Sequence, residues 1–188
     1  TAEANAGDLH GPRLVFEHDP DNNDLGSTRT LEALPMFGSR PALEGLYMES
    51  AIPGPFIFQV QAEMSRRPSA PLARYPSSAR SIEAAVGHLN ELYVNRLILR
   101  SRTKQALFGA DPRFELIAEH GPLQTYAFKD LHSQLIETVD MPLVTRNREN
   151  WLGHAFSRFL VHFPYAERTV YLADGQQLPN IKPSTGFG

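Results

Sequence analysis

Hydrophobic residues recur at helical spacing in two parts of the chain. In residues 82–93, and again from about 148 to 163, apolar side chains fall three or four positions apart, which is typical of a helix with one buried face. Ser81 and Asn147 precede these segments and predict N-caps, because their side chains can accept a bond from a free backbone N–H. The apolar stripe of the second helix consists of Trp151, Leu152, Ala155, Phe156, Phe159, Leu160 and Phe163.

Short apolar runs bounded by turn residues predict strands. Residues 114–119 and 123–128 flank His120-Gly121-Pro122, a spacing that favours a tight hairpin. A short helix is predicted over 103–108, with Gly109 ending it at the C′ position. Further strands are predicted at 13–18, 97–99 and 170–172.

A proline-rich stretch separates the first strand from the central helix. Residues 35–76 hold seven of the fifteen prolines, which disfavours long helices because proline removes a donor and clashes with the preceding turn. Within this stretch, residues 56–62 fit either a buried strand or one side of a short helix, and the periodicity does not decide between them. Residues 65–78 have the composition of an exposed loop.

The order of these elements predicts the fold class. Helix, strand, helix, strand and strand follow one another, which indicates an α/β or α+β fold: a single compact domain with a small mixed sheet covered by two or three helices. We expect this domain to span residues 13–180, with a flexible lead-in at 1–12 and a flexible tail at 181–188.

Composition excludes several classes of protein. Of the 188 residues, 41% are hydrophobic and 21% charged, which excludes a disordered chain. The net charge of −3 gives no general electrostatic attraction to nucleic acid, so no nucleic-acid partner is expected. The absence of cysteine excludes disulfides and thiolate metal sites. No apolar run reaches the ~18 residues of a membrane helix, and no signal peptide is visible at the amino terminus.

An acidic loop at Asp19 to Asp24 has part of the pattern of a calcium site. Asp19, Asp21 and Asn23 alternate as at the start of an EF-hand loop. Asp24 then stands where the loop needs glycine, and Thr30 where it needs a glutamate. The alternative is an Asx turn without a metal.

Three glutamates surround the aromatic part of the proline-rich stretch. Glu44 and Glu49 are candidates for a general acid and base, as in a free-standing glycosidase, and Glu63 follows them. The alternative is that these carboxylates pair with Arg40 or with the backbone and shape the loop. No metal-binding histidine pair, Walker loop or Gly-x-Ser-x-Gly motif is present, and no cofactor is expected.

The second predicted helix carries a basic ridge. His154, Arg158 and His162 are four residues apart, opposite the aromatic stripe. This ridge fits anionic headgroups or the acidic side chains of a partner, or else a solvated helix face. A purely structural or partner-binding module, with the helix at 148–163 docked on a neighbour, is therefore a further hypothesis.

Two stretches resemble a known family of membrane proteins. One runs LPMFGSRPALEGLYMES from Leu34, continues through Pro55-Phe56-Ile57-Phe58 and ends at Gln61-Ala62-Glu63. The other comprises residues 89–94, 111–116 and 121–126. Together they resemble the soluble region that follows the membrane helices of 6-pyruvoyl-tetrahydropterin synthase-related membrane proteins, which are similar to GT-C glycosyltransferases. The likeness covers about residues 13 to 163.

The resemblance implies an extracytoplasmic domain of a polytopic protein, in the periplasm or at the cell surface. Its partners would be the membrane part of the parent protein and a glycan or lipid-linked sugar. Catalytic acids of GT-C enzymes lie between membrane helices, so no catalytic residue is carried over to this chain. Apolar planes and directed polar groups suit a pyranose, so the expected ligand-binding surface consists of Arg40, Glu44, Tyr47, Glu49 and Phe56.

Overall fold

The computed structural model describes residues 10–45, 48–136, 143–145, 150–161 and 169–171. Contacts divide the chain into an N-terminal unit, Thr1–Leu135, and a C-terminal unit, Ile136–Gly188. The expected lead-in at 1–12 lies mostly outside the described residues and the expected tail at 181–188 wholly so. The predicted domain limits therefore stay predictions.

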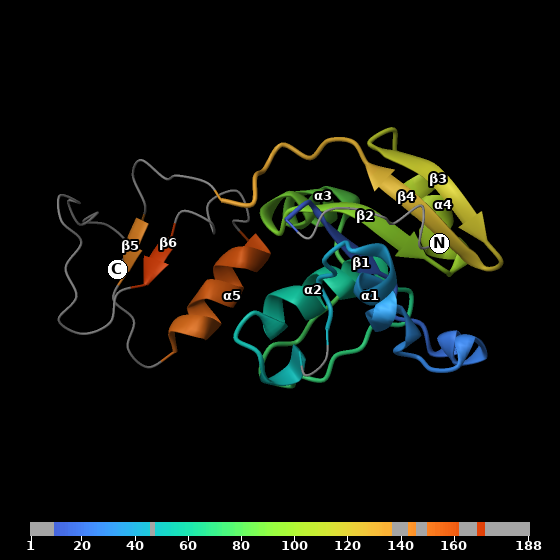
Figure 1. Cartoon of the computed structure of the whole chain (residues 1–188). Coiled ribbons are helices and arrows are strands. Elements are labelled where there is room, and N and C mark those ends of the chain that lie inside the picture. Colours follow the sequence, from blue (N-terminus) through green and yellow to red (C-terminus); the bar gives the residue numbers. More distant parts are fainter. Residues whose placement is uncertain (1–9, 46–47, 137–142, 146–149, 162–168, 172–188) are drawn as a thin grey trace. The chain divides into compact units, whose positions relative to one another are not determined.

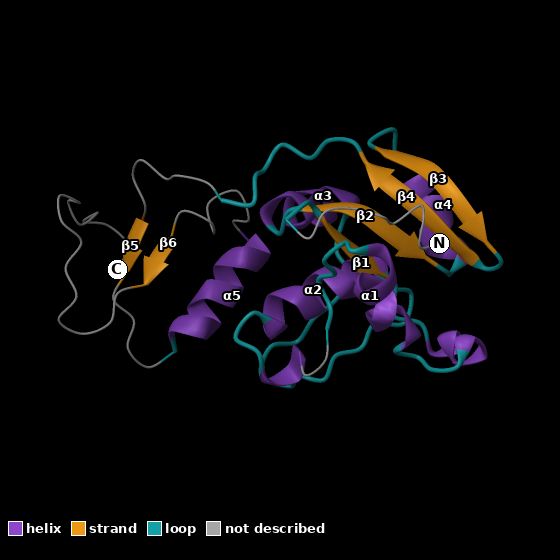
Figure 2. Cartoon of the chain, in the orientation of Figure 1, coloured by secondary structure: helices purple, strands orange, loops and turns teal. Residues whose placement is uncertain are grey.

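A four-stranded mixed sheet forms the centre of the N-terminal unit (Figures 1 and 2). The strand order is β1-β2-β4-β3, in which β1 and β2 are parallel and the other neighbours antiparallel. With its helices, this sheet gives an α+β fold and confirms the predicted fold class. The strands are β1 (Arg13–Phe16), β2 (Val94–Leu99), β3 (Phe114–His120) and β4 (Leu123–Phe128).

The helices of this unit lie in the connections between β1, β2 and β3. Ser81 caps α3 (Ile82–Glu91) by accepting from the backbone N–H of Ala84 at 3.2 Å, as predicted. Three short segments are 3-10 helices: η1 (Pro20–Leu25), η2 (Thr30–Ala33) and η3 (Met48–Ser50). The α-helices are α1 (Leu34–Gly38), α2 (Gly54–Met64), α3 (Ile82–Glu91) and α4 (Arg102–Gly109).

The segment that the sequence left open between strand and helix is the helix α2. Every residue of α2 except Phe56 is buried. A helix buried all round has no polar face, so its sequence lacks the amphipathic period that identifies a surface helix. Pro55 is accommodated because the first turn of a helix does not use its backbone N–H groups within the helix.

Strand register assigns the core to the two faces of the sheet. Phe16 pairs with Ile98, and these residues cluster with Leu14, Leu31 and Leu123 on one face. On the other face, Phe128 stacks on its cross-strand partner Phe114 at 5.1 Å. Phe108 of α4 packs edge-on against Phe114 at 5.0 Å, so α4 covers this second face.

Gly109 does not end α4 in the predicted way. It is the last residue of the helix, and Ala110 follows with a φ of −81°, so no left-handed C′ residue is present there. A Cβ on Gly109 would lie 3.3 Å from Oη of Tyr126. The glycine therefore allows close packing of α4 on β4 rather than a change in helix direction. The left-handed glycine of this region is Gly121, at φ +56°, in the turn of the predicted hairpin.

The C-terminal unit has two short parallel strands, β5 (Leu143–Thr145) and β6 (Thr169–Tyr171), and the helix α5 (Trp151–Val161) between them in sequence. The helix predicted from 148 to 163 is present over 151–161, and its predicted N-cap Asn147 lies outside the described residues. The strand predicted at 170–172 is present as β6, whereas β5 was not predicted. Phe156 and Phe159 of the predicted stripe are buried. Trp151 is 39% exposed, so its assignment to the buried stripe was wrong: it is the first residue of the helix.

Candidate functional site

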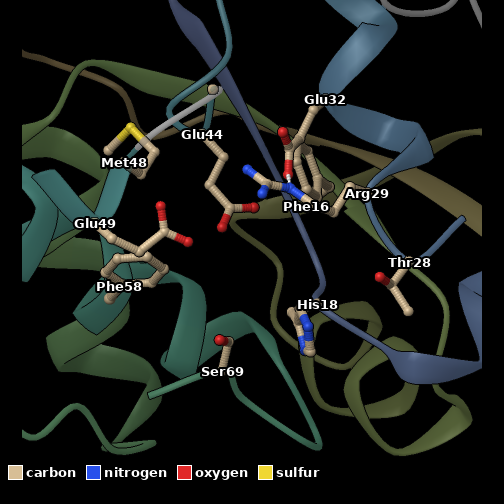
Figure 3. A pocket seen from close by; sticks show the side chains of 11 residues that line it. Phe16, His18, Thr28, Arg29, Glu32, Glu44, Met48, Glu49, Phe58 and Ser69 are labelled. Atoms are coloured by element: carbon tan, nitrogen blue, oxygen red, sulfur yellow. Dashed lines mark hydrogen bonds and ion pairs between the residues drawn. The ribbon is translucent and has the colours of Figure 1, made fainter. Parts of the chain in front are cut away.

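A polar cavity of about 140 Å³ lies beside the carboxyl end of β1 (Figure 3). Engineered cavities of about 150 Å³ hold a benzene molecule, so this one has room for a six-membered ring. Apolar side chains of Phe16, Met48 and Phe58 form part of the wall. The polar side chains of the wall are His18, Thr28, Arg29, Glu32, Glu44, Glu49 and Ser69. We call this site the glutamate cavity.

Backbone pairing along the edge of β1 positions one side of the cavity. The N–H of Leu14 donates to the carbonyl of Pro41, and the N–H of Leu43 donates to the carbonyl of Leu14, both at 2.9 Å. The chain from 41 to 43 therefore runs beside β1 and delivers Glu44 to the end of the strand where Phe16 and His18 lie.

Glu44 is the most perturbed acid of the site. Burial raises its pKa to about 8, and the negative charges of Glu32 and Glu49 act in the same direction. Arg29 and a hydrogen bond from Nε2 of Gln61 to Oε1 of Glu44 act in the opposite direction. Glu44 therefore carries its proton at pH 7, so it can donate a hydrogen bond as well as accept one.

Arg29 and Glu32 form an ion pair at the cavity. Nε of Arg29 donates to Oε1 of Glu32, and this bond raises the pKa of the arginine. The two residues are three positions apart across the start of η2, which is neighbouring spacing in a helical turn. Oε2 of Glu32 is buried and has no hydrogen-bond partner among the described residues.

His18 is held at the cavity by the loop after α2. Its backbone N–H donates to Oγ of Ser65 at 2.9 Å, and Nδ1 lies 3.0 Å from the carbonyl of Arg67. In Figure 3 the carboxyl groups of Glu44 and Glu49 point toward one another, and His18 and Ser69 lie on the side away from Glu32. Acidic, imidazole and hydroxyl groups from separate segments thus meet at one site.

The structure brings together only part of the predicted ligand-binding surface. Glu44 and Glu49 line the glutamate cavity, whereas Arg40 and Phe56 do not. The buried Arg40 donates to the carbonyl of Pro12 at 2.8 Å and to Oδ1 of Asn95 at 3.1 Å, and Phe56 is half-buried on α2. Tyr47 lies outside the described residues.

Several lining residues were missed by the sequence reasoning. His18 was assigned to a strand end and Ser69 to an exposed loop, Arg29 and Glu32 fall in a segment with no predicted element, and no motif links the four. The i, i+3 spacing of Arg29 and Glu32 was the one available signal of an ion pair, and it does not specify a cavity. Glu63, grouped with Glu44 and Glu49 in the sequence, is instead buried between α2 and α3, where it contacts His88.

The acidic loop that invited a calcium interpretation is paired with arginines. Asp19 caps η1 by accepting from the N–H of Asp21 at 3.0 Å, the predicted Asx geometry. Both aspartates contact Arg67, and Asp24 accepts two bonds from Arg100 at 2.6 and 2.9 Å. Among the described residues, no group of three or more histidine, aspartate or glutamate side chains has a geometry that would hold a metal ion.

The basic ridge is described only in part. His154 is exposed and Arg158 half-buried on α5, and His162 lies outside the described residues.

Comparison with known proteins gives no assignment: no family model matches the chain, and neither does any curated protein or solved structure. None of the helices in the described ranges is long and apolar enough to cross a bilayer.

Proposed function

We propose that the chain is an extracytoplasmic domain of a membrane glycosyltransferase-like protein, and that the glutamate cavity recognises one sugar unit of a glycan or a lipid-linked sugar. The observation that supports recognition best is the cavity itself: it has ring-sized volume, an apolar wall and polar groups from several segments. The assignment to a membrane protein rests on the family resemblance of residues 13 to 163.

The mixed wall suits a sugar ring. A pyranose has apolar C–H faces and hydroxyls that both donate and accept, so it needs an apolar plane beside groups of both kinds. Phe58 and Phe16, which are 4% and 3% exposed, are fixed by the core and add small apolar areas to the wall beside Met48. Protonated Glu44 supplies a donor and Glu49 an acceptor.

A second candidate function is glycoside hydrolysis by the same two acids. It is favoured by one observation, the pKa of about 8 that keeps Glu44 protonated beside the negative charge of Glu49. Pairs of carboxyl groups whose environments separate their pKa values provide an acid and a base in glycosidases. The two candidates share a ligand class and differ in whether a bond is broken.

A titration followed by chemical shifts tests the recognition proposal. The 188-residue chain, labelled with ¹⁵N, is titrated with envelope oligosaccharides and with monosaccharides. We expect shifts at Thr28, Glu44 and Ser69 with affinities around millimolar, about −4 kcal/mol. Glu49→Gln should weaken these shifts. Glu115→Gln, which removes an exposed carboxylate from β3, is the matched control and should leave them unchanged.

Two results would contradict the proposal. Shifts that cluster away from the cavity would assign binding to another surface. If no saccharide shifts any resonance of the folded chain, the cavity does not bind sugar. The Arg29–Glu32 and Glu44–Gln61 contacts then serve only to stabilise the fold.

A further inference from the structure

Carboxyl groups outnumber cationic side chains around the glutamate cavity. Glu32, Glu44 and Glu49 line it, and the one arginine of its described lining, Arg29, is already bonded to Glu32. Among the described residues, His18 is the remaining titratable group of the wall. The cavity therefore presents more acceptor than donor capacity to a ligand.

Two buried oxygens beside these acids lack a donor among the described residues. Oε2 of Glu32 has no hydrogen-bond partner, although Oε1 of the same carboxylate binds Arg29. Oε1 of Gln61 also has none, while its Nε2 donates to Glu44, but Gln61 is 1% exposed and lies behind Glu44, outside the described wall of the cavity. Buried acceptors without a donor are unfavourable and rare. Of the two, only Oε2 of Glu32 belongs to a side chain of the cavity wall, where an unpaired acceptor indicates a ligand that brings N–H or O–H groups.

We propose that the sugar bound in the glutamate cavity carries a protonated amine, and that its ammonium group binds among the carboxyl groups of Glu32, Glu44 and Glu49. An ammonium has three donors and no acceptor, which complements this set of oxygens. Its charge also allows Glu44 to ionise beside Glu49, whereas a neutral sugar would leave Glu44 protonated. This inference rests on the proposed function, because it names the class of sugar recognised there.

Binding of such a ligand is linked to a proton. Glu44 faces Glu32 and Glu49, which disfavour its charged form, and Arg29 and Gln61, which favour it. A cation placed beside the group favours the charged form further. Glu44 is protonated before binding at pH 7, so the ammonium should displace its proton into the buffer and leave a carboxylate bound to the amine.

The experiment compares four monosaccharides on the 188-residue chain: glucosamine, 6-amino-6-deoxyglucose, 6-acetamido-6-deoxyglucose and glucose. Affinities come from ¹⁵N chemical shifts at pH 7, and calorimetry is repeated in phosphate and in Tris. At least one amino sugar should bind about tenfold more tightly than glucose, since hydrogen bonds to charged groups are the stronger ones. Its binding enthalpy should differ between the two buffers, because their own ionisation enthalpies differ and a proton is released.

Variants assign the effect to the cavity. Glu44→Gln imitates the protonated acid and should fold normally, yet it should abolish the buffer dependence. Glu49→Gln should reduce the preference for the amine about tenfold. Glu115→Gln removes one exposed charge outside the cavity and should change neither quantity.

The possible failures are distinguishable. If glucose and the amino sugars bind equally well at the cavity, the inference is overturned and the proposed function stands. If no sugar shifts the cavity resonances, the proposed function itself fails. If Glu44→Gln and Glu49→Gln behave like Glu115→Gln, the amine binds elsewhere and the inference is overturned.

Discussion

Nδ1 of His88 lies 2.9 Å from Oε1 and 3.0 Å from Oε2 of Glu63, and neither side chain is exposed to solvent. The pair joins α3 to α2, and Nε2 of Gln59 donates to the same carboxyl group at 2.8 Å. Removing one partner of a buried pair leaves the other desolvated and unsatisfied. Glu63→Ala should therefore lower the free energy of unfolding by about 3–5 kcal/mol, measured by urea denaturation.

A double-mutant cycle separates this pair from general damage to the core. The double variant Glu63→Ala/His88→Ala should lose less free energy of unfolding than the two single variants lose in sum. The reason is that the second change removes a group that the first has already left without a partner. Glu83→Ala, which removes a carboxylate bound to Arg113 at the surface, is the control and should have little effect. Additive losses for Glu63 and His88 would mean that their contact contributes nothing of its own.

Glu17 gives a second stability prediction, because its carboxyl group accepts three backbone bonds. The donors are the N–H groups of Arg66 at 3.0 Å and of Arg100 and Ser101 at 2.8 Å each. Glu17 thus joins the end of β1 to the end of α2 and to the start of α4. In Glu17→Gln one oxygen becomes an N–H₂ group, which cannot accept either from Arg66 or from Arg100 and Ser101, depending on the oxygen replaced. The free energy of unfolding should therefore fall by about 3 kcal/mol.

The measurement for Glu17 is urea denaturation with hydrogen exchange at Arg66, Arg100 and Ser101. Their amides should lose protection in Glu17→Gln and keep it in Glu115→Gln. A variant of native stability with protected amides would show that the amide side chain replaces the carboxyl group without loss.

The acidic loop should bind no calcium. The hydrogen bond from Arg67 lowers the pKa of Asp21, and that from Arg100 lowers the pKa of Asp24, so these acids already have cationic partners. Calcium at about 5 mM, above the dissociation constants of weak extracellular sites, should leave the melting temperature unchanged. A rise of about 3 °C or more, lost in Asp21→Asn, would establish the metal site instead.

The fold was predictable where local patterns carry the information. The helix α3 is specified by residues close in sequence, the N-cap Ser81 and the apolar stripe over 82–93. The β3–β4 hairpin is specified in the same local way by the glycine turn at 121. Two features were not accessible in this way. The helix α2 is buried on all sides, so its sequence has no polar face. Glycine is needed at 109 because Tyr126, which is distant in sequence, packs closely against that position.

The cavity was only partly predictable for the same reason. Glu44 and Glu49 were identified because they are close in sequence and carry chemistry. Their neighbours Glu32 and His18 reach the cavity through the packing of η2 and β1, which depends on contacts over long separations. The effect of Glu32 on the pKa of Glu44 is therefore a property of the fold, not of any local motif.

The chain should not hydrolyse glycosides. Recognition needs only that Glu44 and Glu49 face the ligand, whereas hydrolysis also needs a fixed separation of the two carboxyl groups on either side of the bond. We expect no release of nitrophenol from aryl glycosides between pH 5 and 8. Turnover that Glu44→Gln and Glu49→Gln both abolish, while Glu115→Gln does not, would favour the second candidate function.

Glu44 should make the stability of the protein fall as pH rises. Its pKa is about 8 in the folded chain against an ordinary value of 4.5, so between these values the folded state holds a proton that the unfolded state has released. The free energy of unfolding then decreases by up to about 1.4 kcal/mol for each pH unit. This contribution is complete below about pH 4.5 and lost above about pH 8. Glu44→Gln cannot ionise, so it should match the native chain near pH 4.5 and exceed its stability at pH 8.5 by up to about 5 kcal/mol. Urea denaturation at the two pH values measures the difference, with Glu115→Gln as a control for general charge effects. An equal difference between native and Glu44→Gln chains at both pH values would mean that Glu44 is ionised in the folded protein, and the proton release inferred for amine binding would then be absent as well.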